Sequence, residues 1–491
     1  MRSLTSLAVL SLLPLSLAAP APAPAAVSAP EITPAPTVDE LTTATIEERQ
    51  LLGNLVDGVL SLVRGRLGAV DSAVAAGNPT AVGSLLAQIQ PTSRPTAIAE
   101  VLSKQQSIWA SPTRTNGIYG AFATQVANGL GPALDGTLRT ALNGALPVGE
   151  NSVNNNNKAV RGLYPKKTGK TVATGSKDPS YSVPEAALRA AIFFPPGYTY
   201  GQKTPVLFVP GTGGYGGTNF ANNLRKLLTG KSYADPVWLN VPGAMLADAQ
   251  INAEYIAYAI SYISAVSKNK KIAVVSWSQG GLDTQWVLKY WQSTRSIVQD
   301  FLPVSPDFYG TIFADALCLS ANNGDELNPC APSVIQQERT SQYVARLRSG
   351  GGDSAFVPTT TFYSGVYDEI VEPMQGNAAS AFLNGNNGVR VSNNEVQTVC
   401  ANQPGGSFYS HAGVLYNPLT YALIVDALTH PGTTGQVSRI NRQSVCADLA
   451  APGLDLDDVL ATNGLTPVAA LLLLSSPEKR TTEPPLKSYA T

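Results

Sequence analysis

Histidine and cysteine are scarce in this chain: its 491 residues include only two histidines, His411 and His430, and four cysteines. A zinc site built on the cysteines would need histidine or carboxylate ligands at ligand spacing, and two histidines in the whole chain argue against one. An excess of charge of one sign is also absent, since 33 lysines and arginines balance 34 aspartates and glutamates. A nucleic-acid-binding protein usually carries a basic patch. We therefore expect no metal, no cofactor and no nucleic acid partner.

Long apolar runs are missing except at the N-terminus. The run from Leu7 to Leu17 is too short to span a bilayer, and Pro14 interrupts it. Residues 16–18 (Ser-Leu-Ala) have the small-x-small form of a signal peptidase site. We therefore expect a signal peptide at residues 1–18 and a secreted, extracellular monomer with no membrane span.

Four cysteines in an exported chain are expected to form disulfides. Proximity in the sequence favours Cys318 with Cys330 and Cys400 with Cys446. Four cysteines formally allow three pairings, so spacing alone leaves the connectivity open.

Composition divides the rest of the chain into five segments. Residues 19–38 form a Pro/Ala linker, and the apolar spacing in residues 39–146 is that of helices. Residues 147–172 are polar, Asn-rich and typical of a flexible linker. We expect residues 173–476 to form the large main domain and residues 477–491 to form a C-terminal tail. Residues 19 to about 170 are either a removable prosegment or an accessory helical module that stays attached, and the composition does not distinguish the two.

Residues 173–476 alternate short apolar strands with helical stretches. The expected strands include residues 237–243, 272–276, 301–307 and 359–368, and a strand that runs into a Gly-rich loop over 204–214. The expected helices include residues 220–228 and an amphipathic helix over 248–269. Strands that alternate with helices indicate a mostly parallel sheet covered by helices on both faces. The fold class is therefore α/β, preceded by an all-α N-terminal segment.

The stretch KIAVVSWSQGGLDTQW, residues 271–286, predicts a buried strand, a sharp turn and the start of a helix. A serine at such a turn with glycine two places later is the nucleophile elbow, which holds the hydroxyl clear of the backbone. Ser278 occupies that place, and Ser276 stands where the first glycine of G-x-S-x-G is usual. A small residue is needed at this position because the strand and the helix pass very close to each other at the turn, and serine is nearly small enough.

A serine nucleophile needs a histidine base, and the histidine needs a carboxylate that holds its tautomer. His411 lies in a Gly-rich loop from which it can reach a cleft, whereas His430 ends a helix, an ordinary place for a histidine. In this fold the acid lies between the serine and the histidine. Asp368 is the better candidate for the acid, and Asp307 is the alternative.

Catalysis also needs N–H donors that face the developing oxyanion. The backbone amide after the nucleophile belongs to Gln279, and the Gly-rich loop 210–214 (PGTGG) can supply the second donor. A phosphate-binding loop is the competing interpretation of these glycines. We set it aside because no Gly-Lys-Ser/Thr follows and the GxGxxG spacing fails.

Six motifs in order, VPGTGG, SWSQGGL, SPDFYGT, APSVIQQ, YDEIVEP and SHAG, make residues 175–467 resemble the Candida antarctica lipase B family of secreted fungal α/β-hydrolases. The resemblance implies a nucleophile at Ser278, an acid at Asp368 and a base at His411. It also implies an oxyanion hole formed by Thr212 and Gln279. The implied substrate pocket contains Trp277, Asp307, Thr311, Gln337 and Ile370, so Asp307 changes from a candidate acid to a pocket residue.

The chain also departs from this family. Cys400 and Cys446 are similar to one family disulfide, whereas Cys318 and Cys330 lie in an insertion of this chain. The family's long helix over the pocket entrance is reduced here to LTPVAALLLLSS, residues 465–476. We therefore leave the preferred acyl length open.

Together these features predict a secreted lipase or carboxylesterase that hydrolyses carboxylic esters of lipids, acylglycerols above all, at a lipid–water interface. The enzyme would act through an acyl-enzyme on Ser278. One alternative is an acyltransferase that uses an alcohol other than water. The other is a catalytically silent lipid-binding protein on a hydrolase fold.

Overall fold

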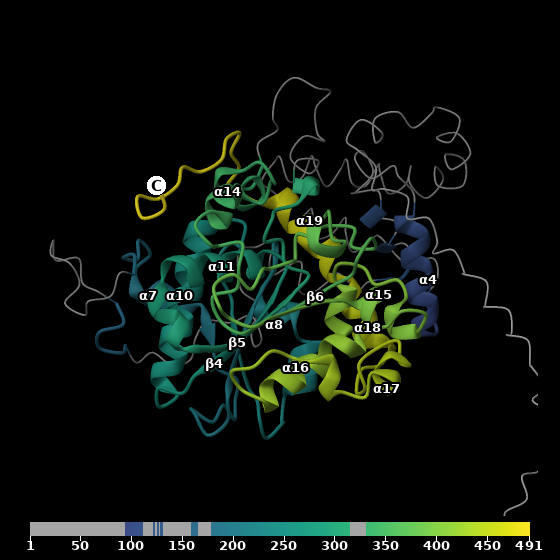
Figure 1. Cartoon of the computed structure of the whole chain (residues 1–491). Coiled ribbons are helices and arrows are strands. Elements are labelled where there is room, and N and C mark those ends of the chain that lie inside the picture. The colour runs from purple at the N-terminus through teal and green to yellow at the C-terminus, as the bar shows by residue number, and fades with distance from the viewer. Residues whose placement is uncertain are drawn as a thin grey trace, which may run out of the picture.

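A seven-stranded sheet forms the centre of the described part of the chain (Figure 1). The structure is a computed structural model, and it describes residues 94–110, 121–122, 125–126, 128–130, 159–164, 178–314 and 330–491. The strands are β1 (Ile192–Phe193), β2 (Pro205–Val209), β3 (Asp235–Leu239), β4 (Ile272–Trp277), β5 (Val298–Val304), β6 (Thr359–Tyr363) and β7 (Val391–Glu395). Their order is β1-β3-β2-β4-β5-β6-β7, and only β1 pairs antiparallel with its neighbour. The predicted α/β class with a mostly parallel sheet is confirmed.

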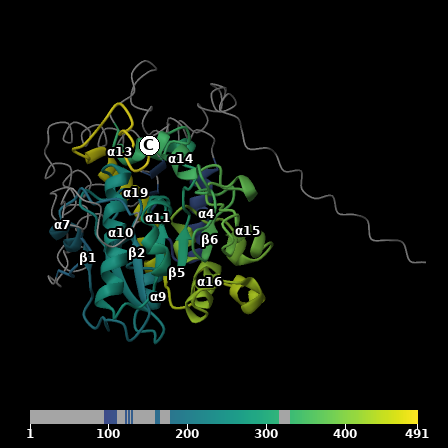
Figure 2. The same cartoon turned by 60° about the vertical axis from the view of Figure 1, so that its left-hand side comes forward.

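Helices cover both faces of this sheet (Figures 1 and 2). The α-helices are α4 (Ile98–Trp109), α7 (Glu185–Ala190), α8 (Gly216–Asn219), α9 (Leu224–Leu228), α10 (Ala249–Val266), α11 (Gln279–Tyr290), α13 (Pro332–Gln336), α14 (Gln342–Arg348), α15 (Val396–Val399), α16 (Pro418–Thr429), α17 (Arg442–Cys446), α18 (Leu456–Asn463) and α19 (Leu465–Ser475). Short 3₁₀ turns are η1 (Gln292–Ser296), η2 (Gly376–Ala378), η3 (Pro404–Gly406), η4 (Gly413–Tyr416) and η5 (Val437–Arg439). One buried cluster packs α10 and α11 against the sheet, and another packs α9, α16 and α18 against its other face. Apolar strands thus contact a helix layer on each side.

The strand predictions differ from the structure mainly at the ends of strands and at the sheet edges. β5 and β6 end at Val304 and Tyr363, before the polar loops that the prediction included. The edge strands β1 and β7 were not predicted. β1 has two residues, and β7 has the polar sequence VSNNE, so neither shows a clear apolar pattern.

Helix α10 is buried around most of its circumference, so the prediction of an amphipathic helix was wrong. Its outer face is covered by the residues before α7 and by the C-terminal residues. Glu254 on α10 is fully buried and accepts hydrogen bonds from Ser182 N, Val183 N and Lys487 Nζ. Segments distant in the sequence therefore take the place of solvent on this helix.

The chain on either side of the predicted catalytic domain packs onto it. Residues 159–164, inside the segment expected to be a flexible linker, contact the core, and the Tyr164 hydroxyl donates to Val183 O at 2.9 Å. Near the C-terminus Ala490 is fully buried, and the Tyr489 ring lies 5.3 Å from that of Trp291. The expected signal peptide and Pro/Ala linker lie outside the described residues.

Helix α4 belongs to the predicted helical N-terminal segment and packs against the C-terminal part of the chain. Val101 and Leu102 are buried in the same cluster as α16 and α18. The Gln105 amide donates to Asn463 Oδ1 at 3.2 Å, and Arg94 forms an ion pair with Asp457. This part of the segment is therefore docked on the catalytic domain.

Cys400 and Cys446 form a disulfide, with Cα atoms 5.3 Å apart. Cys330 is also disulfide-bonded. Its expected partner, Cys318, lies outside the described residues, so the pairing of Cys318 with Cys330 stays a prediction.

Asp300 on β5 gives a prediction about stability. It is 1% exposed, its Oδ2 has no hydrogen-bond partner among the described residues, and burial raises its pKa to about 7. An acid whose pKa is higher in the folded state contributes stability below its unfolded pKa and loses that contribution as the pH rises through about 7. We expect Asp300→Asn to increase the free energy of unfolding by roughly 2–4 kcal/mol at pH 8 and to change it little at pH 4.5. Urea titrations at the two pH values test this.

Asp426→Asn is the matched control for Asp300→Asn. Hydrogen bonds from Arg439 outweigh burial and hold the pKa of Asp426 below its usual value, so its loss should destabilise the protein at pH 8. Equal effects of Asp300→Asn at pH 4.5 and pH 8 would contradict the prediction.

Candidate active site

Ser278 lies in a strained turn between β4 and α11. Its backbone has φ 54° and ψ −132°, a conformation that residues other than glycine rarely adopt. The following glycines allow close packing: a Cβ on Gly280 would lie 2.4 Å from Pro210 O, and one on Gly281 would lie 2.5 Å from Pro306 Cβ. Ser276 fits at the position of the first glycine, where its side chain is fully buried. The geometry is that of the predicted elbow.

His411 and Asp368 form a buried pair. Nδ1 of His411 lies 2.9 Å from Asp368 Oδ2 and 3.0 Å from Oδ1. Backbone N–H groups of Ile370 and Val371 donate to Asp368 Oδ1 at 3.1 and 2.8 Å, which hold the carboxylate in place. The other histidine, His430, is half exposed and pairs with Asp426 at the end of α16.

Two further carboxyl groups lie close to this pair. Glu369 Oε2 accepts a hydrogen bond from the His411 backbone N–H at 2.7 Å, and burial together with the charge of Asp368 raises the pKa of Glu369 to about 7. Burial also raises the pKa of Asp307 to about 7. Burial alone would lower the pKa of His411, but the charge and hydrogen bond of Asp368 and the charges of Glu369 and Asp307 raise it above 6.5. The imidazole therefore lies in a negative environment that favours its protonated form.

Three polar side chains form a network beside Ser278. The Thr212 hydroxyl lies 2.8 Å from Gln279 Oε1 and 3.0 Å from Gln337 Oε1, and Gln337 Nε2 donates to Gln279 Oε1 at 3.1 Å. Both contacts of the hydroxyl are acceptors, so it acts as a donor. A hydroxyl donor at this place can bond to an oxyanion instead of an amide oxygen.

A cavity of about 70 Å³ brings most of the expected residues together. Ser278, His411, Thr212 and the expected pocket residues Trp277, Thr311, Gln337 and Ile370 line it. Asp307 does not line it, contrary to our expectation. Its side chain is fully buried, and neither carboxyl oxygen has a hydrogen-bond partner among the described residues.

The cavity wall also contains residues that the sequence did not identify. Helix α19 supplies Thr466, Ala469, Ala470 and Leu473, and helix α13 supplies Val334. Phe122, Phe313, Ala314 and Val371 complete the wall. The run LTPVAALLLLS shows an apolar helix but not which residues face the site. Phe122 carried no signal, because it lies in the N-terminal segment and reaches the cavity only through tertiary packing with Trp109 and Ala470.

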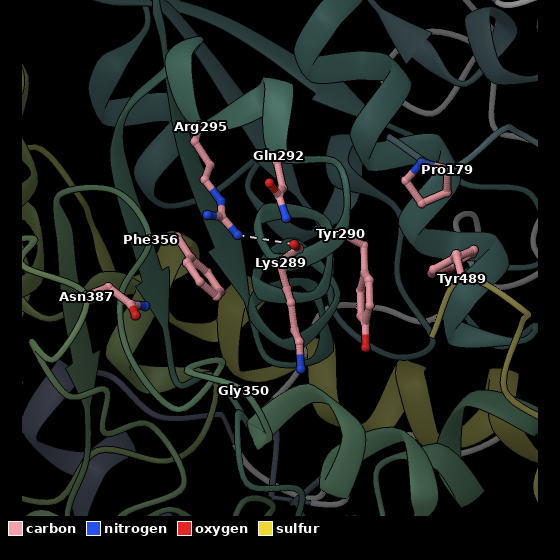
Figure 3. A pocket seen from close by; sticks show the side chains of 9 residues that line it. All are labelled: Pro179, Lys289, Tyr290, Gln292, Arg295, Gly350, Phe356, Asn387 and Tyr489. Atoms are coloured by element: carbon pink, nitrogen blue, oxygen red, sulfur yellow. Dashed lines mark hydrogen bonds between the residues drawn. The ribbon is translucent and has the colours of Figure 1, made fainter. Parts of the chain in front are cut away.

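A larger cavity of about 520 Å³ lies at the C-terminal end of α11 and shares no lining residue with the Ser278 cavity (Figure 3). The two basic side chains that line this cavity, Lys289 and Arg295, already donate hydrogen bonds to backbone carbonyl groups. Lys289 Nζ donates to the carbonyls of Arg346, Leu347 and Ser349, and Arg295 donates to those of Leu288 and Lys289. These contacts hold helix ends in place.

Within the described ranges, no cluster of three or more His, Cys, Asp or Glu side chains could hold a metal ion.

Comparison with known proteins identifies the family. No family model matches the sequence. Lipase B of Pseudozyma antarctica is 36% identical over 326 residues, a match that covers 65% of this chain and 89% of that protein. The chain belongs to the lipase B family. The crystal structure of Aspergillus fumigatus lipase B is 41% identical, has a TM-score of 0.73, and the match covers 88% of this chain and 100% of that one. The chain is thus a serine ester hydrolase with the α/β-hydrolase fold, like its lipase B relatives.

Proposed function

We propose that the chain is a secreted lipase that hydrolyses carboxylic esters of lipids through an acyl-enzyme on Ser278. The observation that carries the proposal is the shared cavity: a serine on a strained elbow and a histidine paired with a buried aspartate line the same apolar space. Nucleophile, base and orienting acid are the parts that serine acyl transfer requires.

In the proposed reaction His411 removes the proton of Ser278 as Oγ attacks the ester carbonyl. Asp368 faces Nδ1 of His411, so Nε2 is the nitrogen left to take this proton. His411 then gives the proton to the departing alcohol, and water repeats the sequence to release the acid. No hydrogen bond joins the Ser278 hydroxyl to His411 in the part of the chain described, and such bonds often form only when substrate binds.

The proposed oxyanion hole consists of the Gln279 backbone N–H and the Thr212 N–H and hydroxyl. We expect Thr212→Val, which removes only the hydroxyl, to lower kcat by about 10²-fold and to change KM little, because the bond forms mainly in the transition state. Steady-state kinetics with p-nitrophenyl butyrate test this. Thr466→Val, at another cavity-lining threonine, is the control. An equal loss of kcat in both variants would argue against a role for the Thr212 hydroxyl.

The cavity walls support a lipid acyl chain as the bound group. Besides the catalytic groups, phenylalanine, leucine, isoleucine, valine and alanine side chains form most of the lining, and no charged side chain other than His411 is among them. Apolar walls favour an aliphatic chain over a peptide or sugar. Acylglycerols at a lipid–water interface are therefore the proposed substrates.

Secretion rests on the N-terminal sequence, with its apolar run and small-x-small site at residues 1–18. In the described part of the chain, no helix combines the length and the apolar character needed to cross a bilayer. N-terminal sequencing of the protein recovered from the culture medium tests the proposal, which expects no molecule that begins at Met1.

An active-site label tests the chemistry. A p-nitrophenyl alkylphosphonate should release one equivalent of p-nitrophenol and leave one phosphonyl group on the peptide that contains Ser278, because the trapped adduct resembles the tetrahedral intermediate. Mass spectrometry locates the adduct, and hydrolysis of tributyrin and triolein before and after labelling measures activity. A label on another residue, or full activity after stoichiometric labelling, would refute the proposed nucleophile.

A further inference from the structure

Glu369 is a buried carboxyl group that the proposed mechanism does not use. It follows Asp368 in the chain, is 1% exposed, and its Oε2 accepts the His411 backbone N–H at 2.7 Å. Its Oε1 has no hydrogen-bond partner among the described residues. A buried acid with one unsatisfied oxygen is costly to folding. Proteins retain local costs of this kind mainly at functional sites, where other parts of the fold compensate for them.

We propose that Glu369 is a positioning residue for His411: it fixes the backbone of the base and, as a carboxylate, adds a second negative charge beside the imidazole. This role depends on the proposed function, because it requires His411 to be the base. It is separate from the role of Asp368, which faces the ring.

Two consecutive residues contact the same histidine from different sides. Asp368 faces ring atom Nδ1, and Glu369 binds the backbone N–H, so ring and main chain are both held. Asp368 is itself held by the N–H groups of Ile370 and Val371. A rigid support of this kind keeps a catalytic group in its productive position.

The charges around His411 connect Glu369 with the pH dependence of catalysis. The charges of Asp368, Glu369 and Asp307 act on His411, those of Asp368 and His411 act on Glu369, and Tyr416 interacts electrostatically with Glu369. The carboxylate form of Glu369, which prevails above its pKa of about 7, contributes a negative charge that stabilises the imidazolium, and Glu369→Gln removes that charge. The pKa of His411 then falls, so the neutral base persists to lower pH.

Glu369→Gln tests the charge alone, because the glutamine oxygen can still accept the His411 N–H. We expect the acidic limb of kcat/KM against pH, measured with p-nitrophenyl butyrate, to move to lower pH by about 0.5–1 unit. At pH 8.5, kcat should stay within about threefold of wild type, because the hydrogen bond is kept.

Asp300→Asn is the matched control. Asp300 is likewise buried, accepts a backbone N–H, from Gly432 at 3.2 Å, and has a pKa of about 7, but it lies on β5 and does not line the Ser278 cavity. Asp300→Asn should leave the acidic limb where it is in the wild type.

Glu369→Met removes charge and acceptor together, and we expect kcat to fall about tenfold with KM unchanged, because the His411 backbone loses its partner.

The outcomes separate this role from the proposed function. An acidic limb that stays in place in Glu369→Gln, while wild type shows a clear limb, overturns the role of Glu369 and leaves Ser278 and His411 as proposed. A shift of equal size in Asp300→Asn also overturns it, because the effect would then be general. Full activity in His411→Ala would instead refute the proposed function. If Glu369→Met does not fold, the dependence of kcat/KM on pH in Glu369→Gln still tests the role of Glu369.

Discussion

Replacement of Ser278 by alanine is expected to lower kcat for ester hydrolysis by about five to six orders of magnitude. Alanine removes the nucleophilic oxygen, and no acyl-enzyme can form without it. The fold should persist, because alanine adopts the φ of 54° as readily as serine and is smaller only by the hydroxyl group. Stopped assays with p-nitrophenyl butyrate at high enzyme concentration measure the loss, and circular dichroism checks the fold.

Ser276→Ala is the matched control in the same elbow. Ser276 is fully buried, and its hydroxyl has no hydrogen-bond partner among the described residues. Its removal should keep kcat within about threefold of wild type and should not lower the unfolding temperature, because an unsatisfied buried hydroxyl is lost. If Ser278→Ala kept more than a thousandth of wild-type activity, a nucleophile other than Ser278 would have to act.

Asp368→Asn is expected to lower kcat by about 10⁴-fold. The N–H groups of Ile370 and Val371 would hold the asparagine oxygen where Oδ1 now lies, so the amide nitrogen would face His411 Nδ1. Nδ1 would then accept a hydrogen bond, and the ring proton would move to Nε2. A histidine protonated at Nε2 cannot take the proton of Ser278. The kcat at pH 8 and the ¹⁵N shifts of the ring nitrogens measure both parts of this expectation.

Asp426→Asn changes the second histidine–aspartate pair of the described chain. His430 is half exposed, and Asp426 pairs with it and with Arg439 at the end of α16. We expect this variant to lose stability but to keep kcat within about twofold of wild type, because neither residue lines the Ser278 cavity. A similar loss of kcat in both variants would mean that Asp368→Asn acts through folding and not through the tautomer.

Much of the site could be predicted because its signals are local. The strand, turn and glycines around Ser278 are contiguous, so the elbow was visible in one stretch of sixteen residues. The scarcity of histidine left two candidate bases, and loop position favoured the one that the structure pairs with Asp368. Both Asp368 and Asp307 follow a strand at a short distance, so the order along the chain only favoured Asp368, and the family resemblance then assigned Asp307 to the pocket.

Other features could not be read from the sequence, because they depend on contacts between distant segments. Asp307 matched a pocket motif, yet its side chain is fully buried and does not line the cavity. Phe122 reaches the cavity from a segment more than 150 residues before Ser278 in the chain. The apolar spacing of α10 indicated one buried face, whereas the residues before α7 and the C-terminal residues bury the other.

The sequence by itself determined the α/β class, the elbow at Ser278 and the order of serine, acid and histidine, because periodicity and turn chemistry act over a few neighbouring residues. Only the tertiary structure decided which carboxyl groups surround His411, which side chains wall the cavity, and that Glu369 binds the backbone of the base. Burial and hydrogen-bond pairing depend on atoms that the fold brings together from distant parts of the chain, and these contacts determine the protonation and position of the catalytic groups.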